Sequence, residues 1–461
     1  MAGPPEIYSA PDPRRFDSPV VDAGRAVVLR LRSAGYEAYF AGGFVRDILI
    51  GRPIHDIDIA TNAHPDTVAT LFANSRTFGK SFGVVQVDSG PFQFEVATFR
   101  QDIDYRDGRR PSGVVFTTAA EDASRRDFTI NGMFYDPVEH HVIDYVGGWT
   151  DIERRVVRAI GDPARRFEED HLRIMRAVRF ASVLNFTIDP ATWTCIRASA
   201  PLLRAISMER IRDELMRTFM ESVRPGEALA LLRDAGVLDA VFPELSALQG
   251  VQQPPEFHPE GDVFEHVRLM LDLMKERSPE LIWSILLHDI AKPATFAVGP
   301  GRDGKPRIRF HGHAEQGAVM AETIMRRFRC PNDMIAAVKQ AVLRHMRFIA
   351  VPDMRLATRR KWVGAPTFPL ELELHRIDCQ SSHGKLDHYE QMLAFQKELA
   401  AEPALPAPLV TGRDLLKLGY ASGPEMGDLL KQIYDAQLEG RFQSHDDAMA
   451  WVRDNIAPPG T

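Results

Sequence analysis

The pattern of apolar and polar residues divides the chain into a first part rich in strands and a longer part rich in helices. In the first 150 residues, short runs of β-forming residues alternate with turns that contain Gly, Pro or Asn. This pattern predicts strands over Tyr36–Ala41, Asp56–Ala60, Val84–Asp88 and Phe92–Phe99.

Beyond about residue 150, apolar residues recur every three or four positions, which is typical of helices with one buried face. We predict helices over Glu168–Leu184, Met208–Met220 and Pro225–Ala235. The Pro/Ala-rich segment Ala401–Leu409 reads as a linker before a last helical unit. The expected fold is therefore α+β: a head with a mixed sheet (1–150), then an all-helical neck (151–225), body (226–400) and tail (401–461).

Composition narrows the class of protein. The chain has 461 residues, 44% of them hydrophobic and 26% charged, which is ordinary for a soluble protein with several domains. The apolar run Leu281–Leu287 is too short to cross a bilayer, and the N-terminus lacks the apolar stretch of a signal peptide. The three cysteines are scattered without CxxC spacing, which argues against a disulfide framework or a cysteine zinc site and favours a reducing cytoplasm.

The net charge of −7 does not by itself indicate a nucleic-acid-binding protein. The distribution of charge matters more, and eight arginines gather within 26 residues. They are Arg154, Arg155, Arg158, Arg165, Arg166, Arg173, Arg176 and Arg179. Acidic residues are interleaved with them, so a solvated charged face is the alternative interpretation.

A candidate phosphate-binding turn lies near the start of the head. The predicted strand ends at Ala41, Gly42 and Gly43 form a tight turn, and a helix begins near Phe44. Such a turn lets backbone N–H groups approach a phosphate, and Arg46 adds a charged donor. A structural turn with no ligand has the same signature, so this feature alone is weak.

Two aspartates on the next predicted strand strengthen the interpretation. Asp56 and Asp58 are two positions apart and project from one face, whereas Ile57 and Ile59 point toward a core. Two carboxylates on one face repel each other unless a cation lies between them. Mg²⁺ takes carboxylate and phosphate oxygens, and two such ions suit phosphoryl transfer. The alternative is a solvated turn.

A third carboxylate lies on the following strand. In Phe92–Arg100, alternation places Phe92, Phe94 and Val96 on one face and Glu95 on the other. Glu95 is expected either to reach the same metal ions or to pair with an arginine on an exposed face.

These motifs together resemble a known family. GGFVRD (42–47), HDIDIAT (55–61) and RRDFTINGM (125–133) are similar to class II tRNA nucleotidyltransferases and bacterial poly(A) polymerases, a branch of the polymerase-β-like nucleotidyltransferases. The similarity continues through 144–181 and 208–219 and resumes in 409–440, so it covers nearly the whole chain. It implies a polymerase-β-like head and template-independent addition of C, A or both to tRNA 3′ ends from CTP and ATP, with release of pyrophosphate.

The resemblance also implies roles for particular residues. Asp56 and Asp58 hold Mg²⁺, with Glu95 as a further catalytic carboxylate. The residues expected to contact the nucleotide are Gly42, Gly43, Arg46, Arg126, Asp127, Asn131, Asp170, Arg173, Arg176 and Arg179.

In the family, the Asp and first Arg of an EDxxR motif select the base, and here they are Asp170 and Arg173. On a continuous helix these two residues are about 60° apart and share a face. A carboxylate acceptor beside a guanidinium donor matches the amine and ring acceptor of cytosine and adenine, and it mismatches uracil and guanine. His171 departs from the residues common at that position in the family, with an unknown effect on the pocket.

The polar segment between Thr98 and Glu121 resembles a flexible loop that helps relatives to switch from C to A. Its presence disfavours an enzyme that adds only CC. It does not separate full CCA addition from A-only or poly(A) addition.

A second site is expected in the body. His266, His288–Asp289 and Asp378 occur in the order H…HD…D, which is similar to the HD superfamily of phosphohydrolases. His and carboxylate ligands suit a divalent metal, and His311, His313 and His345 are further candidates for a second ion or for phosphate. An HD-type phosphohydrolase or phosphodiesterase, with a head that only binds nucleotide, is therefore the alternative main activity; a non-catalytic RNA-binding scaffold fits the paired aspartates least.

Overall fold

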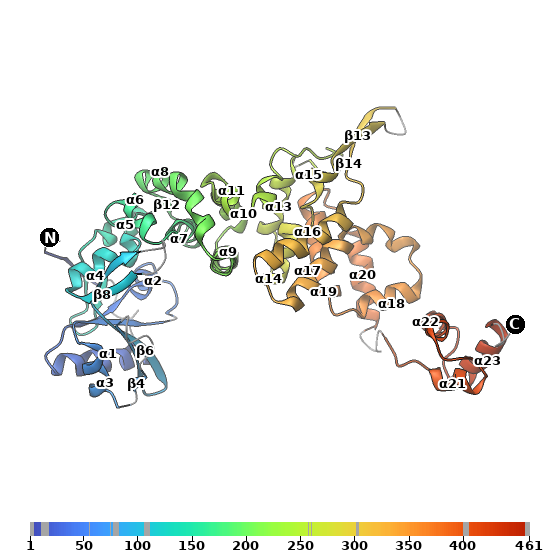
Figure 1. The fold of residues 1–461 in the computed structure, drawn as a ribbon, viewed down its shortest axis with the longest axis horizontal. Coiled ribbons are helices and arrows are strands. Elements are labelled where there is room, and N and C mark those ends of the chain that lie inside the picture. The colour runs from blue at the N-terminus through green and yellow to red at the C-terminus, as the bar shows by residue number, and fades with distance from the viewer. Residues whose placement is uncertain are drawn as a thin grey trace. The chain divides into compact units, whose positions relative to one another are not determined.

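The computed structural model describes residues 4–10, 18–54, 56–73, 75–76, 83–105, 111–256, 258–259, 261–300, 304–399 and 405–456, with the backbone alone for 102–105 and 111–112. The chain divides into two compact units, Met1–Ser246 and Ala247–Thr461 (Figure 1). Each is described by itself.

The first unit is built on one mixed sheet. Its strand order is β1-β10-β9-β2-β3-β6-β5-β4, and β3–β6 is the parallel pair among otherwise antiparallel neighbours. The strands are β1 (Glu6–Ser9), β2 (Ala38–Ala41), β3 (Asp58–Thr61), β4 (Ser75–Arg76), β5 (Val84–Ser89), β6 (Phe92–Thr98), β9 (Phe134–Asp136) and β10 (His141–Asp144). The four predicted strands are confirmed as β2, β3, β5 and β6, with small shifts at their ends.

One face of this sheet is covered by helices α1 (Pro19–Ser33) and α3 (Pro65–Leu71). The alternating apolar residues of the central strands, among them Phe40, Ile59 and Val96, are fully buried in this core. Burying aromatic and branched side chains is the main stabilising term of such a layer. The opposite side chains of β3 and β6 are consequently directed away from the core.

The connections around the sheet support the other face. Helix α2 (Gly43–Leu49) follows β2 directly, through Gly42 with a φ of +70°. Helix α4 (Ala119–Arg125) precedes the 3₁₀ turn η3 (Thr129–Asn131), and α5 (Gly148–Arg154) packs on that turn. A Cβ on Gly148 would lie 2.2 Å from the Thr129 carbonyl oxygen, so this close backbone contact requires glycine.

Helices follow the sheet to the end of the first unit, with two short strands among them. They are β11 (Val156–Val157), α6 (Pro163–Glu169), α7 (Arg173–Leu184), β12 (Thr187–Ile188), α8 (Pro190–Ser199), η4 (Ala200–Ala205), α9 (Met208–Glu221), α10 (Pro225–Asp234), α11 (Val237–Val241) and α12 (Pro243–Ser246). The helices predicted over Met208–Met220 and Pro225–Ala235 are confirmed as α9 and α10.

The single helix predicted over Glu168–Leu184 is wrong in its first turn. The chain leaves α6 at Asp170, whose backbone is extended (φ −143°, ψ 104°), and enters α7 at Arg173. The Asp170 carboxylate accepts a hydrogen bond from the Leu172 backbone N–H at 3.1 Å. An aspartate that bonds nearby backbone groups competes with the helix in this way.

The segment predicted as a flexible loop carries a two-stranded antiparallel pair, β7 (Arg100–Tyr105) with β8 (Pro111–Phe116). Residues 106–110, which connect the two strands, lie outside the described residues.

The second unit is mainly helical. Its elements are α13 (Val263–Asp272), α14 (Pro279–Leu287), α15 (Lys292–Thr295), β13 (Ala297–Pro300), β14 (Pro306–Arg309), α16 (His313–Arg327), α17 (Asn332–Arg344), η5 (His345–Asp353), α18 (Leu356–Val363), α19 (Phe368–Ser381), α20 (Asp387–Glu398), α21 (Gly412–Lys417), α22 (Pro424–Leu438) and α23 (His445–Asn455).

The α+β class with a largely helical remainder is confirmed. The all-helical description needs one correction, because a parallel pair (β11–β12) and an antiparallel hairpin (β13–β14) interrupt the helices. Among the helices that the structure describes, none combines the length and apolar character that crossing a bilayer requires.

Candidate active site

A cavity of about 600 Å³ lies in the first unit, between the ends of β2, β3 and β6 and the helices α7 and α9. It brings together most of the residues expected to bind nucleotide and metal. They are Gly42, Gly43, Arg46, Asp58, Glu95, Arg126, Asp127, Asn131, Asp170, Arg173, Arg176 and Arg179. Residues that lie more than 100 positions apart in the sequence thus line one space.

The strand alternation expected for the aspartates is present. Asp56 and Asp58 are exposed, and Ile57 and Ile59 are buried with exposed fractions of 4% and 0%. Asp58 is the first residue of β3 and lines the cavity; Asp56 precedes the strand and is not among the residues lining it.

Glu95 lies beside Asp58 across the parallel pair, since the two residues are partners in the β3–β6 register. Loss of solvent around the Asp58 carboxyl is the largest cause that raises its pKa above the ordinary value. The negative charges of Glu95 and Asp56 raise this pKa further, whereas the positive charge of Arg126 lowers it. Carboxylates that oppose one another's ionisation are stabilised by a cation. The donor set therefore fits a divalent metal ion that also takes phosphate oxygens.

The turn at Gly42 separates this acidic pair from a basic side chain. A Cβ on Gly42 would lie 3.1 Å from Arg126 Nη1 and 3.7 Å from Asp58 Oδ2. The positive φ of Gly42 also disfavours any other residue there. The backbone conformation therefore favours glycine at the turn that the sequence indicated, and a side chain there would also press against the Arg126 guanidinium.

Arg126 is held in place by a buried carboxylate that sequence reasoning missed. Asp122, with an exposed fraction of 2%, accepts from Arg126 Nη2 at 3.0 Å and from Arg125 Nη2 at 2.7 Å. These two arginines, which both line the cavity, hold the pKa of Asp122 below its ordinary value despite its burial. The RRD motif thus depends on an acid one helical turn upstream.

Asp127 joins the two walls of the cavity. Its Oδ1 accepts from the Phe128 backbone N–H at 2.8 Å and from Asn131 Nδ2 at 3.0 Å, and its Oδ2 accepts from Arg176 Nε at 2.8 Å. Burial raises its pKa, but the charge of Arg176 and these hydrogen bonds outweigh burial and hold the pKa well below the usual range. Asp127 therefore stays ionised and links η3 to α7.

The same network includes the arginine of the glycine turn. Asn131 Oδ1 accepts from Arg46 Nη1 at 2.7 Å, and Asp47 accepts from Arg46 Nε at 2.9 Å. Arg46 is 9% exposed, and burial lowers its pKa. Asn131 thus connects Arg46 to Asp127, so Arg46, Asn131, Asp127 and Arg176 form one hydrogen-bonded chain.

Asp170 and Arg173 both line the cavity, although not by the helical geometry expected from the sequence. Asp170 lies in the turn before α7, and Arg173 is the first residue of that helix. Glu169 accepts from Arg173 Nη1 at 2.8 Å, and Arg210 Nη2 of α9 lies 3.5 Å from Asp170 Oδ1. A carboxylate and a guanidinium therefore still face one cavity side by side.

His171 lies in the same turn. Its Nδ1 is 2.7 Å from the Phe167 carbonyl oxygen, which gives this departure from the family pattern a local hydrogen-bonding partner.

The arginine cluster of the sequence serves two purposes. Arg173, Arg176 and Arg179 line the cavity, whereas Arg158 pairs with Asp151 at 3.0 Å and Arg165 with Glu169 at 3.4 Å outside it. Sequence reasoning missed several other lining residues, among them Arg125, Phe180 and Arg210.

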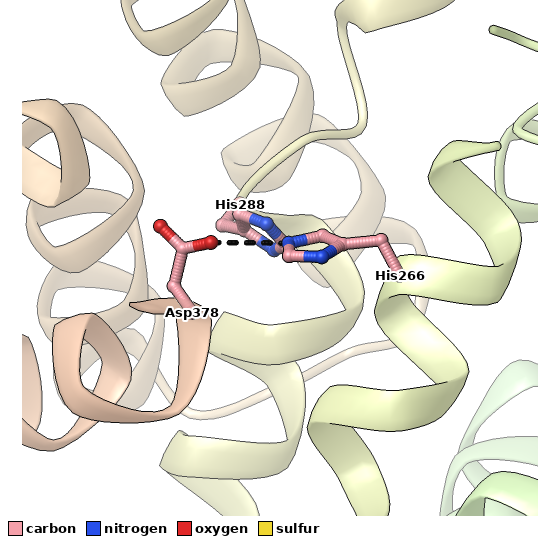
Figure 2. A group of neighbouring side chains, drawn as sticks. All are labelled: His266, His288 and Asp378. Atoms are coloured by element: carbon pink, nitrogen blue, oxygen red, sulfur yellow. Dashed lines mark ion pairs between the residues drawn. The ribbon is translucent and has the colours of Figure 1, made fainter. Parts of the chain in front are cut away.

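A cluster of histidine and aspartate side chains lies in the second unit. His266, His288 and Asp378 come from α13, the end of α14 and α19, and their ligand atoms all lie within 4.8 Å of one another (Figure 2). His266 Nε2 is 3.1 Å from Asp378 Oδ1. The fold therefore brings together residues of the H…HD…D pattern that lie far apart in the sequence.

Asp289 lies in a neighbouring group with His313 and His345. It is 2% exposed and has the partners that its burial requires: His288 Nε2 at 3.1 Å and Lys292 Nζ at 2.6 Å from its Oδ2. The charges of His288 and Lys292 lower its pKa despite burial.

Three of these histidines are oriented by the backbone. Nδ1 of His288, His313 and His345 lies 2.9, 2.8 and 2.7 Å from the carbonyl oxygens of Ile285, Phe310 and Val342. When such a histidine binds a metal ion, an N–H donated from Nδ1 leaves the Nε2 lone pair for the ion. Burial lowers the pKa of His345 to about 4, which keeps it neutral. The donor set fits a divalent metal.

His313 and His345 line a cavity of about 410 Å³ together with Asp289, Lys292 and Asp378. His311, the remaining candidate, is exposed on its rim. Both predicted groups are thus assembled by the fold.

Both units of the chain resemble known proteins. Three family models match: the poly A polymerase head domain over residues 38–158, the "Probable RNA and SrmB- binding site of polymerase A" over 185–248, and the HD domain over 262–379. A CCA-adding enzyme of Limosilactobacillus reuteri is 44% identical over 449 residues, 96% of this chain and 98% of the relative. This chain belongs to the CCA-adding enzyme family.

Other CCA-adding enzymes support the same assignment. That of Lactobacillus johnsonii is 43% identical over 93% of this chain and 96% of its own. The crystal structure of the Bacillus stearothermophilus CCA-adding enzyme in complex with CTP has a TM-score of 0.72 and 26% identity, and it covers 95% of this chain and 98% of that one. A Thermotoga maritima CCA-adding enzyme complexed with tRNA shares the fold, with a TM-score of 0.61 and 18% identity. CCA-adding enzymes are nucleotidyltransferases, a class that depends on divalent metal ions.

Asp127→Asn is expected to destabilise the first unit by roughly 1–3 kcal/mol near neutral pH, because it removes the buried carboxylate that pairs with Arg176, whose side chain is 33% exposed and stays partly hydrated. The folded pKa of Asp127 is depressed, so its contribution is fully present above the ordinary aspartate pKa and is lost as the pH falls through the folded value. Denaturant unfolding of both proteins should therefore show a difference that shrinks below about pH 4. A difference independent of pH would contradict the ion-pair interpretation.

Proposed function

We propose that this protein adds C and A nucleotides to the 3′ end of tRNA without a nucleic-acid template, using CTP and ATP and releasing pyrophosphate. The observation that carries the proposal is the juxtaposition of Asp58 and Glu95 with Asp170 and Arg173 in one cavity. The first pair suits nucleotidyl transfer, and the second pair suits recognition of a base.

The head residues are proposed to act as follows. Asp56, Asp58 and Glu95 would hold Mg²⁺, which would neutralise charge on the phosphates. The tRNA 3′-hydroxyl gives its proton to solvent, its oxygen bonds to the α-phosphorus, and the bond from that phosphorus to pyrophosphate breaks. Arg126 supplies positive charge across the Gly42 turn from these carboxylates. Fixed charges in a cavity stabilise a charged transition state because they need not reorganise.

Base selection is proposed to rest on Asp170 and Arg173. Asp170 accepts from the exocyclic amine of cytosine or adenine, and Arg173 donates to the ring acceptor beside it. Glu169 and Arg210 fix the two side chains from either side, at 2.8 Å from Arg173 and 3.5 Å from Asp170. Uracil and guanine present the opposite pair and leave buried groups unpaired, which is a strong basis for rejection.

The head (1–150) is proposed to carry the chemistry, the neck (151–225) to recognise the base, the body (226–400) to hold the HD-like site, and the tail (401–461) to bind tRNA. Full CCA addition is preferred over A-only or poly(A) addition because relatives that match nearly the whole chain are CCA-adding enzymes. The test uses tRNAs that lack the whole CCA end, incubated with CTP and ATP together, and sequences the 3′ ends of the products. Products extended by A alone would contradict full CCA addition.

A second activity is proposed for the HD-like site. His266, His288, Asp289 and Asp378 hold a divalent metal ion, because Nε2 of His288 and His266 face carboxylate oxygens inside a buried pocket. Lys292 and Arg309 line the cavity and add positive charge for a phosphate ester, so hydrolysis of a phosphomonoester or phosphodiester is the matching reaction class.

Asp58→Asn is expected to lower kcat for CMP and AMP incorporation at least about 1,000-fold and to leave tRNA affinity nearly unchanged, because the residue holds metal rather than RNA. Asp56→Ala should behave similarly. Asp88→Asn, on the neighbouring strand β5, is the matched control and should retain activity. Single-turnover incorporation of labelled CTP measures the effect; retained turnover in Asp58→Asn would refute the assignment.

Asp170→Ala is expected to relax base choice, with discrimination between CTP and UTP falling by about 100-fold, since the acceptor that rejects uracil is gone. The ratio of kcat/KM for the two nucleotides measures this. Unchanged rejection of UTP would show that another group selects the base.

His288→Gln is expected to remove a tightly held divalent ion from the second unit. Metal content after desalting is measured in a chain that also carries Asp58→Asn, so that the head contributes little. His311→Gln changes an exposed histidine on the rim of the neighbouring cavity; it is the matched control and should keep the ion. Equal metal content in the His288→Gln and His311→Gln proteins would count against the site.

A further inference from the structure

The aromatic ring of Phe180 lies among three arginine side chains of the nucleotide cavity. The guanidinium carbon of Arg179 is 4.3 Å from the ring centroid, that of Arg46 is 5.0 Å away, and that of Arg176 is 5.2 Å away. Phe180 is 5% exposed and itself lines the cavity. Its ring also meets that of Phe128 edge to face at 5.7 Å, which fixes its orientation.

Each guanidinium in this group is anchored to a different element. Arg46 donates to Asn131 of η3 at 2.7 Å, Arg176 donates to Asp127 at 2.8 Å, and Arg179 donates to Glu214 of α9 at 2.6 Å. Phe180 is the one side chain that all three arginines share among these contacts. The Phe180 ring on α7 is therefore surrounded by arginines whose partners lie in three places: η3, the segment just before it, and α9.

Three positive charges around one ring repel each other, and burial adds to the cost. Burial is the first cause that lowers the pKa of Arg46, and the charge of Arg179 acts in the same direction. The negative face of an aromatic ring attracts guanidinium groups and offsets part of this repulsion. Asp47, Asp127 and Glu214, which pair with Arg46, Arg176 and Arg179, offset much of the rest. Each guanidinium has five N–H donors, and the donors beyond these pairs match a ligand with several adjacent anionic oxygens.

We infer that Phe180 is a positioning residue that holds Arg46, Arg176 and Arg179 as one subsite for the polyphosphate of the incoming nucleotide. This subsite is separate from the base-selecting pair Asp170 and Arg173. The inference rests on the proposed nucleotide binding, but it assigns the ring to the phosphates and not to the base. Phe180 therefore sets affinity for every nucleoside triphosphate equally.

The test compares Phe180→Leu with Phe180→Tyr in the full chain. Leucine keeps the apolar contact and removes the ring, so binding of inorganic tripolyphosphate, CTP, ATP and UTP should weaken by a common factor on the order of tenfold, as measured by calorimetry. KM should rise by the same factor with kcat little changed, and the CTP-to-UTP preference should stay as in the wild type. Tyrosine retains the ring and should restore most of the affinity.

Phe128→Leu is the matched control for packing, because Phe128 touches the Phe180 edge and is fully buried. Its thermal midpoint should fall at least as much as that of Phe180→Leu, while tripolyphosphate binding stays closer to wild type. A loss of CTP-to-UTP preference in Phe180→Leu with unchanged tripolyphosphate binding would overturn the inference and place the ring against the base. Unchanged binding of all four ligands would reduce Phe180 to a core residue.

Tripolyphosphate binding is measured without tRNA or catalysis, so it separates this inference from the proposed function. A wild-type protein that binds tripolyphosphate through Phe180 and adds no nucleotide to tRNA would contradict the proposed function alone.

Discussion

One buried carboxylate joins the two walls of the nucleotide cavity. Asp127 accepts hydrogen bonds from its own turn and from Arg176 of α7, and Asn131 extends the connection to Arg46. Because a buried charge without its partner is costly, the helix that carries the arginines is fixed relative to the strand that carries the carboxylates. The distance between phosphate chemistry and base recognition is thereby set by the fold.

The parts of the site that are determined by residues close together in the sequence were predictable from it. Strand alternation alone placed Asp58 and Glu95 away from the core, and glycine with an adjacent helix signal identified the turn at Gly42. These features were predictable because neighbouring residues determine them. The order of His266, His288–Asp289 and Asp378 likewise indicated one group. The fold brings His266, His288 and Asp378 together, and it places Asp289 in a neighbouring group with His313 and His345.

Other parts depend on contacts across long separations and were not predictable. Apolar periodicity runs through Glu168–Leu184, but the Asp170 carboxylate bonds the Leu172 backbone and ends the helix there. The partners Asp122 and Glu214 have no sequence signal that ties them to Arg126 and Arg179. Phe180 occupies an apolar position of a helix, so the sequence alone gives it an ordinary core role.

The alternation of acidic and apolar residues on β3 also fixes the register in which this strand pairs with its neighbours. A pairing slip by a single residue would turn Asp58 into the hydrophobic layer and bring Ile59 out into the solvent-filled space. Such a chain would bury a lone charge and lose an apolar contact, at a combined cost of several kcal/mol. Molecules with a misaligned strand would therefore fail to fold, and those that fold carry their acidic groups on the correct side.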